Sequence, residues 1–190
     1  MLWLVFFSVA AATEIIIHIV SLQHYQSAWI FHVYTCIEYI LIAKILGHWQ
    51  NKLVYSRLMQ ASIPVYLLSF AFIKAVGFEG FEAGLYNNIT RPLALLFLTT
   101  FTLLTLLDLW RNTSINLTDD YRFWMLFAMA LYYSASLGLF AFMYTKNQEL
   151  LIALFKIHAV INIIHNLLFT IGVFKVRAAQ QVALEPSSSS

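Results

Sequence analysis

Long apolar stretches alternate with short polar segments along the whole chain. Each long stretch is close to the ~20 residues that a helix needs to cross the ~30 Å hydrocarbon core of a bilayer. These stretches run over residues 2–21, 28–46, 58–76, 91–110, 123–144 and 150–174. The pattern predicts an all-α fold, a polytopic integral membrane helix bundle with about six transmembrane helices.

The composition supports this prediction. Hydrophobic residues make up 61% of the 190 residues and charged residues 11%, against roughly 25% charged residues in an ordinary soluble domain. So large an apolar surplus cannot be hidden inside one core of this size and must face lipid. No run of Lys and Arg is long enough to bind nucleic acid. We therefore expect the lipid bilayer as a partner, and no nucleic acid.

The chain is expected to form one transmembrane domain over residues 1–176, followed by a disordered tail over 177–190 that contains Pro186 and four serines. The first apolar stretch lacks a basic start, and Glu14 and His18 interrupt it, so we interpret it as a retained helix. The missing basic start leaves open that the chain continues upstream.

Basic residues are distributed unequally between the two ends of the predicted spans. One side carries Lys44, Lys52, Arg57, Arg111, Arg122, Lys175 and Arg177. The other side carries Lys74, Arg91 and Lys146. By the positive-inside rule, both termini are predicted to be cytoplasmic.

Three predicted helices carry polar residues inside their apolar stretches, at a cost of roughly 2.5–3.5 kcal/mol for each ionisable group at mid-membrane. The candidate site residues are Glu14, His18, His32, Glu38, His158, Asn162 and His165. On the first and last helices, their spacings of three and four place them on one face of the helix. We expect them to form one buried cluster, because a carboxylate beside an imidazole at low dielectric suits proton exchange.

This cluster predicts a sensor or transport-type membrane protein that binds a proton-linked or small polar ligand. A second interpretation is a haem- or zinc-dependent intramembrane enzyme that uses His18, His32, His158 or His165, although no cofactor is predicted outright. A third is a non-catalytic membrane-complex subunit in which the polar groups only hold helices together. The chain has no nucleotide-binding loop or nucleophile elbow, so we do not expect ATP-driven chemistry from it. Whether it is an enzyme stays open.

Small residues recur every four positions in the fifth stretch, at Ala130, Ser134 and Gly138. Such a stripe lets two helices approach closely. It predicts a contact surface for another helix, in a homo- or hetero-oligomer.

Two segments resemble known proteins. The sequence IHAVINIIHNLLFTIG at residues 157–172 resembles the closing helix of small, uncharacterised membrane proteins of Bacteroidota, and residues 34–39 resemble their second helix. The resemblance implies a multi-pass protein of the cell membrane, the inner membrane of a bacterium, and implies no particular chemistry. Glu14 and His18 also resemble one motif of the ceramidase-type zinc hydrolases, but the paired histidines of that family have no counterpart here.

Overall fold

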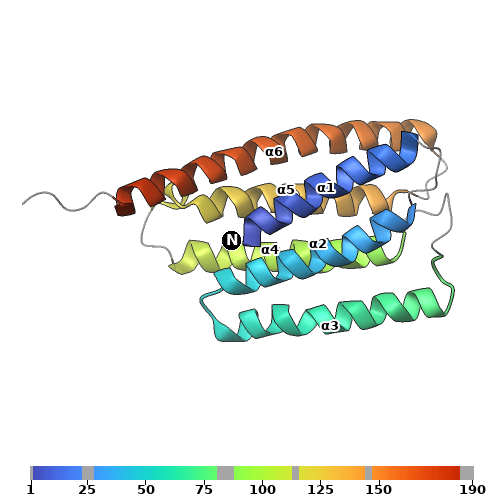
Figure 1. Cartoon of the computed structure of the whole chain (residues 1–190), viewed down its shortest axis with the longest axis horizontal. Helices are drawn as coiled ribbons and strands as arrows, with labels where there is room; N and C mark the ends of the chain where they lie inside the picture. The colour runs from blue at the N-terminus through green and yellow to red at the C-terminus, as the bar shows by residue number, and fades with distance from the viewer. Residues whose placement is uncertain (1, 23–27, 81–87, 113–115, 144–146, 185–190) are drawn as a thin grey trace, which may run out of the picture. The chain divides into compact units, whose positions relative to one another are not determined.

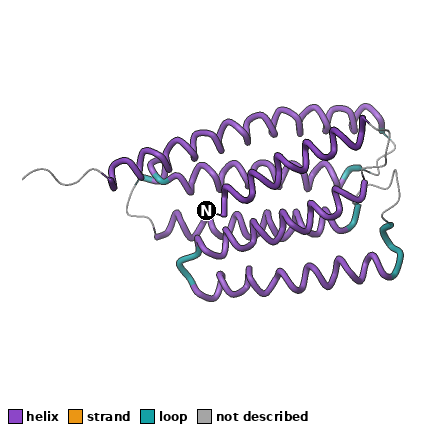
Figure 2. Tube along the Cα trace, viewed as in Figure 1, coloured by secondary structure: helices purple, strands orange, loops and turns teal. Residues whose placement is uncertain are grey.

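The computed structural model describes residues 2–22, 28–80, 88–112, 116–143 and 147–184, and every regular element in these ranges is a helix (Figures 1 and 2). The elements are α1 (Leu2–Leu22), α2 (Ala28–Trp49), α3 (Leu53–Ala75), α4 (Thr90–Asn112), the short 3-10 helix η1 (Leu117–Asp119), α5 (Tyr121–Ala141) and α6 (Gln148–Leu184). The predicted all-α fold is confirmed. Each α-helix lies on one predicted stretch. The largest differences are at the end of α6, which continues to Leu184 and not only to residue 174, and at the start of α3, which begins at Leu53 and not at residue 58.

Five described helices are long and apolar enough to cross a membrane. They cover Trp29–Trp49, Leu53–Ala75, Thr90–Asn112, Tyr121–Ala141 and Gln148–Val176. The apolar part of α1, Val5–Val20, is shorter. By length and composition, the chain therefore fits a membrane protein.

The helices form two compact units, Met1–Phe101 and Thr102–Ser190. Unit 1 holds α1, α2, α3 and the first half of α4, and unit 2 holds the rest. The sequence pattern predicts one transmembrane domain and does not separate these units, because every stretch has the same apolar character. Helices joined by short links pack as antiparallel neighbours in each unit.

In unit 1, α2 packs against both α1 and α3 (Figure 1). The Tyr39 hydroxyl donates a hydrogen bond to Ser62 Oγ at 2.8 Å, and the rings of Tyr39 and Tyr66 stack with their centroids 4.2 Å apart. Ser62 and Tyr66 lie on α3, and both tyrosines are buried. These contacts fix the register of α2 against α3 at the middle of both helices.

The C-terminal end of α3 makes a tight turn at Gly77, whose φ is 78°. Gly77 N donates to Lys74 O and Phe78 N donates to Ile73 O, both at 3.2 Å. These two bonds form a Schellman motif, in which glycine takes the left-handed conformation at little steric cost. The turn directs the chain back toward the last turn of α3 and sets the position of Glu79.

In unit 2, the N-cap of α5 is Asp120, whose Oδ1 accepts a hydrogen bond from Arg122 N at 2.8 Å. In the sequence, Thr118 before Asp119 and Asp120 resembles an N-cap followed by anions. An N-cap at Thr118 is a wrong prediction, because residues 117–119 form η1 and the helix begins two residues later than such a cap requires. The Thr118 carbonyl accepts a hydrogen bond from Trp124 Nε1 instead.

Helices α5 and α6 pack antiparallel and lie close together at Gly172. A Cβ added at Gly172 would lie 2.8 Å from Met125 Cγ and 3.4 Å from Tyr121 O. At Gly138, by contrast, an added Cβ would meet no atom within 4 Å. Within unit 2, the close approach between helices thus depends on Gly172 of α6, a residue outside the predicted small-residue stripe on α5.

Helix α6 continues to Leu184, whereas the sequence predicts disorder from residue 177. Residues 177–184 include alanines, glutamines and leucine, which favour helix, and Pro186 follows. Good helix formers therefore extend the span past its apolar part. The remaining tail, 185–190, lies outside the described residues.

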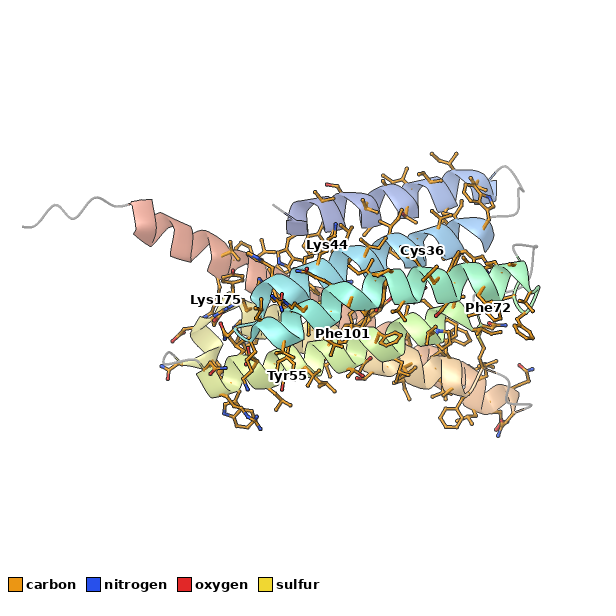
Figure 3. All side chains as sticks on the ribbon, turned by 90° about the horizontal axis from the view of Figure 1, so that it is seen from below. Cys36, Lys44, Tyr55, Phe72, Phe101 and Lys175 are labelled. Atoms are coloured by element: carbon orange, nitrogen blue, oxygen red, sulfur yellow. The ribbon has the colours of Figure 1, made fainter. Side chains whose placement is uncertain are left out.

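The exposed faces of these helices are apolar. On α3, Val65, Leu68 and Phe72 are at least half exposed, and Phe72 is labelled in Figure 3. On α6, Val160, Ile163, Leu167 and Phe174 are similarly exposed. Four charged side chains of unit 1, those of Glu38, Lys74, Glu79 and Arg91, are instead at most 12% exposed, whereas Lys44, Lys52 and Arg57 are exposed. Apolar outside and polar inside is the distribution that a bilayer favours.

Candidate functional site

The end of α3, the following turn and α2 bring together an ammonium group, a carboxylate and an imidazole. Lys74 Nζ donates hydrogen bonds to Glu79 Oε2 and to His32 Nδ1, both at 2.9 Å. The His32 ring nitrogen lies 3.9 Å from the same carboxylate oxygen. The side chains of His32, Lys74 and Glu79 are 0%, 8% and 3% exposed. The Lys74 ammonium is thus shared between the Glu79 carboxylate and the His32 imidazole, and all three groups lie inside the protein.

The Glu79 carboxylate is held by donors from two sides. Besides Lys74, Thr90 Oγ1 donates to Oε2 at 2.6 Å and Ile89 N donates to Oε1 at 2.8 Å. Ile89 and Thr90 lie at the start of α4, where unpaired backbone N–H groups and the helix dipole favour an anion. The three donors together form a carboxylate-binding site, which Glu79 fills from within the chain.

This environment favours the ionised form of Glu79, which lies outside the five candidate spans. Burial alone would raise the pKa of Glu79. The hydrogen bonds from Lys74, Thr90 and Ile89 and the charge of Lys74 outweigh burial and hold that pKa below its ordinary value. The carboxylate stays ionised only because the donors stay in place.

A second pair of opposite charges lies next to the first. Arg91 Nη1 donates a hydrogen bond to Glu38 Oε2, and the two side chains are 12% and 3% exposed. Glu38 is six residues after His32 on α2, or about 9 Å further along the helix axis. Arg91 therefore extends from the first turn of α4 toward the middle of α2.

Tyr66 connects this region to the packed centre of unit 1. Its hydroxyl donates to the Thr90 carbonyl at 3.3 Å, while its ring stacks on Tyr39. We refer to six residues as the charged cluster: His32, Glu38, Lys74, Glu79, Thr90 and Arg91. With His32 neutral, its two cations and two carboxylates give a net charge of zero. A proton that enters the cluster therefore needs a compensating negative charge. At low dielectric the two charges interact strongly, so the entry of one is coupled to the entry of the other.

Two predicted site residues, His32 and Glu38, lie in this cluster. Two others are on α1, where the His18 side chain is exposed. Glu14 belongs to the same helix, and its side chain lies outside the described part of the structure.

The three predicted site residues on α6 lie in unit 2. His158 Nε2 is 2.9 Å from Ser136 Oγ on α5. The Tyr132 ring lies against both histidines, with centroids 5.6 Å from His158 and 4.8 Å from His165. Asn162, between them in sequence, is exposed. His158 and His165, which are seven residues apart and share one face of α6, thus lie against the same ring, that of Tyr132.

Sequence reasoning missed Lys74, Glu79 and Arg91. In the sequence, the lysine and the arginine lie near the ends of predicted spans, and Glu79 lies between the third and fourth apolar stretches. The sequence does contain one signal for Glu79. Gly77 lies between Lys74 and Glu79, and a glycine directly after a helix is typical of a turn that directs the chain back toward that helix. The Glu38–Arg91 pair, 53 residues apart in sequence, had no local signal.

Within the described residues, no group of three or more His, Cys, Asp or Glu side chains is arranged to hold a metal ion. Comparisons with protein-family models, with curated proteins and with solved structures found no match to this chain.

Proposed function

We propose that this chain is a multi-pass membrane protein of the sensor or transport type, whose charged cluster binds a small polar ligand in a proton-linked manner. The observation that carries the proposal is the sharing of the Lys74 ammonium by Glu79 and His32 in a buried site. Because both neighbours respond to the same cation, a proton or ligand that changes one of them changes the other.

The energetic cost of the cluster supports this proposal. Buried ion pairs are often no more stabilising than apolar side chains of similar volume. Ionisable groups inside membrane helices pair with one another and mark ion paths, proton relays or ligand sites.

For the location, we propose the inner membrane of a bacterium, with both termini in the cytoplasm. The resemblance of residues 157–172 supports the membrane, and the unequal distribution of basic residues supports the orientation. The charged cluster then lies toward the outer side, where the α3–α4 connection is expected.

Infrared difference spectroscopy tests whether the cluster binds protons as a unit. The protein would be titrated with acid in detergent, and the carboxyl band of Glu79 assigned as the band that Glu79→Gln removes. Protonated His32 favours ionised Glu79, so His32→Gln should shift the midpoint of that band to higher pH. His48→Gln, at an exposed position on α2, is the matched control and should leave the midpoint unchanged.

An unchanged midpoint in His32→Gln would show that His32 and Glu79 titrate independently. The charged cluster would then be structural only, and the proposal would be wrong.

One observation favours a second candidate, a subunit that docks another membrane protein through α5. Ser134 is exposed, and the space at Gly138 is open to at least 4 Å, so these two positions of the predicted stripe are available to a partner helix, whereas Ala130 is buried. This candidate predicts a co-purifying membrane protein that Gly138→Leu releases. Only monomer after cross-linking in native membranes would exclude it.

A further inference from the structure

The donors around Glu79 belong to the facing ends of two helices. Lys74 is in the last turn of α3, Thr90 is the first residue of α4 and Ile89 directly precedes it. Their donor atoms lie 2.9, 2.6 and 2.8 Å from the Glu79 oxygens. An ammonium, a hydroxyl and a backbone N–H converge on one point, as in sites that bind free carboxylates.

We infer that this site binds the carboxylate group of an external ligand, which takes the place of Glu79 and leaves Glu79 to take up a proton. The inference rests on the proposed function and names its ligand class. One carboxylate enters with one proton, and no bond is made or broken other than the O–H bond of Glu79. The net charge of the cluster stays at zero.

The coupling between ligand and proton follows from the groups that act on Glu79. Its ionised form is favoured by the three donors and by the charge of Lys74, while burial favours the neutral acid. When a ligand occupies the donors, burial is the main remaining effect on the displaced side chain. A displaced Glu79 that stays inside the protein therefore takes up a proton from solution.

Within the described residues, the charged and titratable groups near Glu79 come from three helices. Helix α2 contributes His32, Cys36 and Glu38, α3 contributes Lys74 and Tyr66, and α4 contributes Arg91. Arg91 is paired with Glu38, so Lys74 is the cation that loses its carboxylate when Glu79 is displaced. The ligand carboxylate replaces that charge.

Binding of trifluoroacetate to the full chain in detergent, followed by its ¹⁹F signal, tests the inference. This anion stays ionised across the range used, about pH 5 to about pH 8, so only the protein changes its protonation. If one proton enters with each anion, the affinity should fall about tenfold for each pH unit of increase. An affinity that does not depend on pH would overturn the exchange.

Variants separate the cation from the competing carboxylate. Glu79→Ala should bind trifluoroacetate more tightly and without pH dependence, whereas Glu149→Ala, at an exposed site on α6, should behave as wild type. Lys74→Met should weaken binding at least tenfold, and Lys156→Met, also exposed, should not. Thr90→Val removes one donor and keeps every charge, and it should also bind trifluoroacetate more weakly. This variant tests the site even if Lys74→Met does not fold.

Competition identifies the source of the carboxylate. Displacement of trifluoroacetate by acetate and decanoate at similar concentrations assigns a water-soluble acid, and displacement by far less decanoate assigns a fatty acid of the membrane. No displacement by either would overturn the inference. If His32 and Glu79 titrate as a coupled pair but no carboxylate binds, the proposed function stands and this inference alone fails.

Discussion

Gly77 is the residue on which the geometry of the charged cluster depends most directly. A side chain at φ 78° costs about 1–2 kcal/mol, so Gly77→Ala should lower the free energy of unfolding by about that amount. Gly47→Ala is the control, because Gly47 is helical and an added Cβ would meet its first neighbour at an ordinary 3.5 Å. That change should be neutral or stabilising by up to about 1 kcal/mol. Unfolding in mixed micelles would measure both, and equal effects would contradict the prediction.

Glu79 makes stability depend on pH in a direction that its environment fixes. Its pKa is lower in the folded protein than in the unfolded chain. The ionised side chain therefore stabilises the fold above the unfolded pKa, and this contribution disappears as the pH falls through the folded pKa. As the pH is lowered, the thermal unfolding temperature of the wild type should fall more steeply than that of Glu79→Gln. Parallel curves for the two proteins would show that the donors do not favour the ionised form.

At the residue scale, the sequence predicted half of each pairing in unit 1. His32 and Glu38 were selected because polar groups in apolar helices are costly, and that argument needs only local sequence. Their partners Lys74 and Arg91 lie near helix ends, where a basic side chain can either pair with a buried carboxylate or extend to water. The choice between pairing inward and extending to water depends on how helices pack in space, which local sequence does not encode.

At the element scale, the position of close helix packing separates two glycines. Gly172→Ala should destabilise unit 2 by about 1–3 kcal/mol, because the new methyl group would overlap Met125 and crowd the Tyr121 carbonyl. Gly138→Ala, with no atom within 4 Å, should be neutral or slightly stabilising in the isolated chain. Unfolding in the same micelles measures both. A larger loss of unfolding free energy in Gly138→Ala than in Gly172→Ala would contradict the prediction and locate the close contact on the small-residue stripe of α5.

The helices themselves could be predicted almost completely, because each is encoded by one apolar stretch of membrane-spanning length. Their ends were less accurate where the sequence is polar but helix-forming. The start of α3 at Leu53 and the continuation of α6 to Leu184 are both of this kind. Apolar length predicts where a helix can meet lipid, while helix propensity decides how far it continues beyond lipid.

At the scale of the whole molecule, the open question of topology is whether α1 crosses the membrane. Its apolar part, Val5–Val20, spans about 24 Å as a helix, a few ångströms less than the ~30 Å hydrocarbon core. Local thinning of the bilayer accommodates such a difference at modest cost. Of the three basic residues expected outside, Lys74 and Arg91 are paired with buried carboxylates, so two of the three positive charges there are neutralised. Six spans with both termini inside is therefore the arrangement that we predict.

Cysteine labelling tests this arrangement directly. In a Cys36→Ser background, single cysteines would replace Leu2, Asn88 and Ser187, and intact cells would be treated with a maleimide that does not cross membranes. Asn88→Cys should react in intact cells, while Leu2→Cys and Ser187→Cys should react only after lysis. Reaction of Leu2→Cys in intact cells would place α1 outside the bilayer core or along its surface. Five spans would then remain, and the N-terminus would be on the opposite side from the C-terminus.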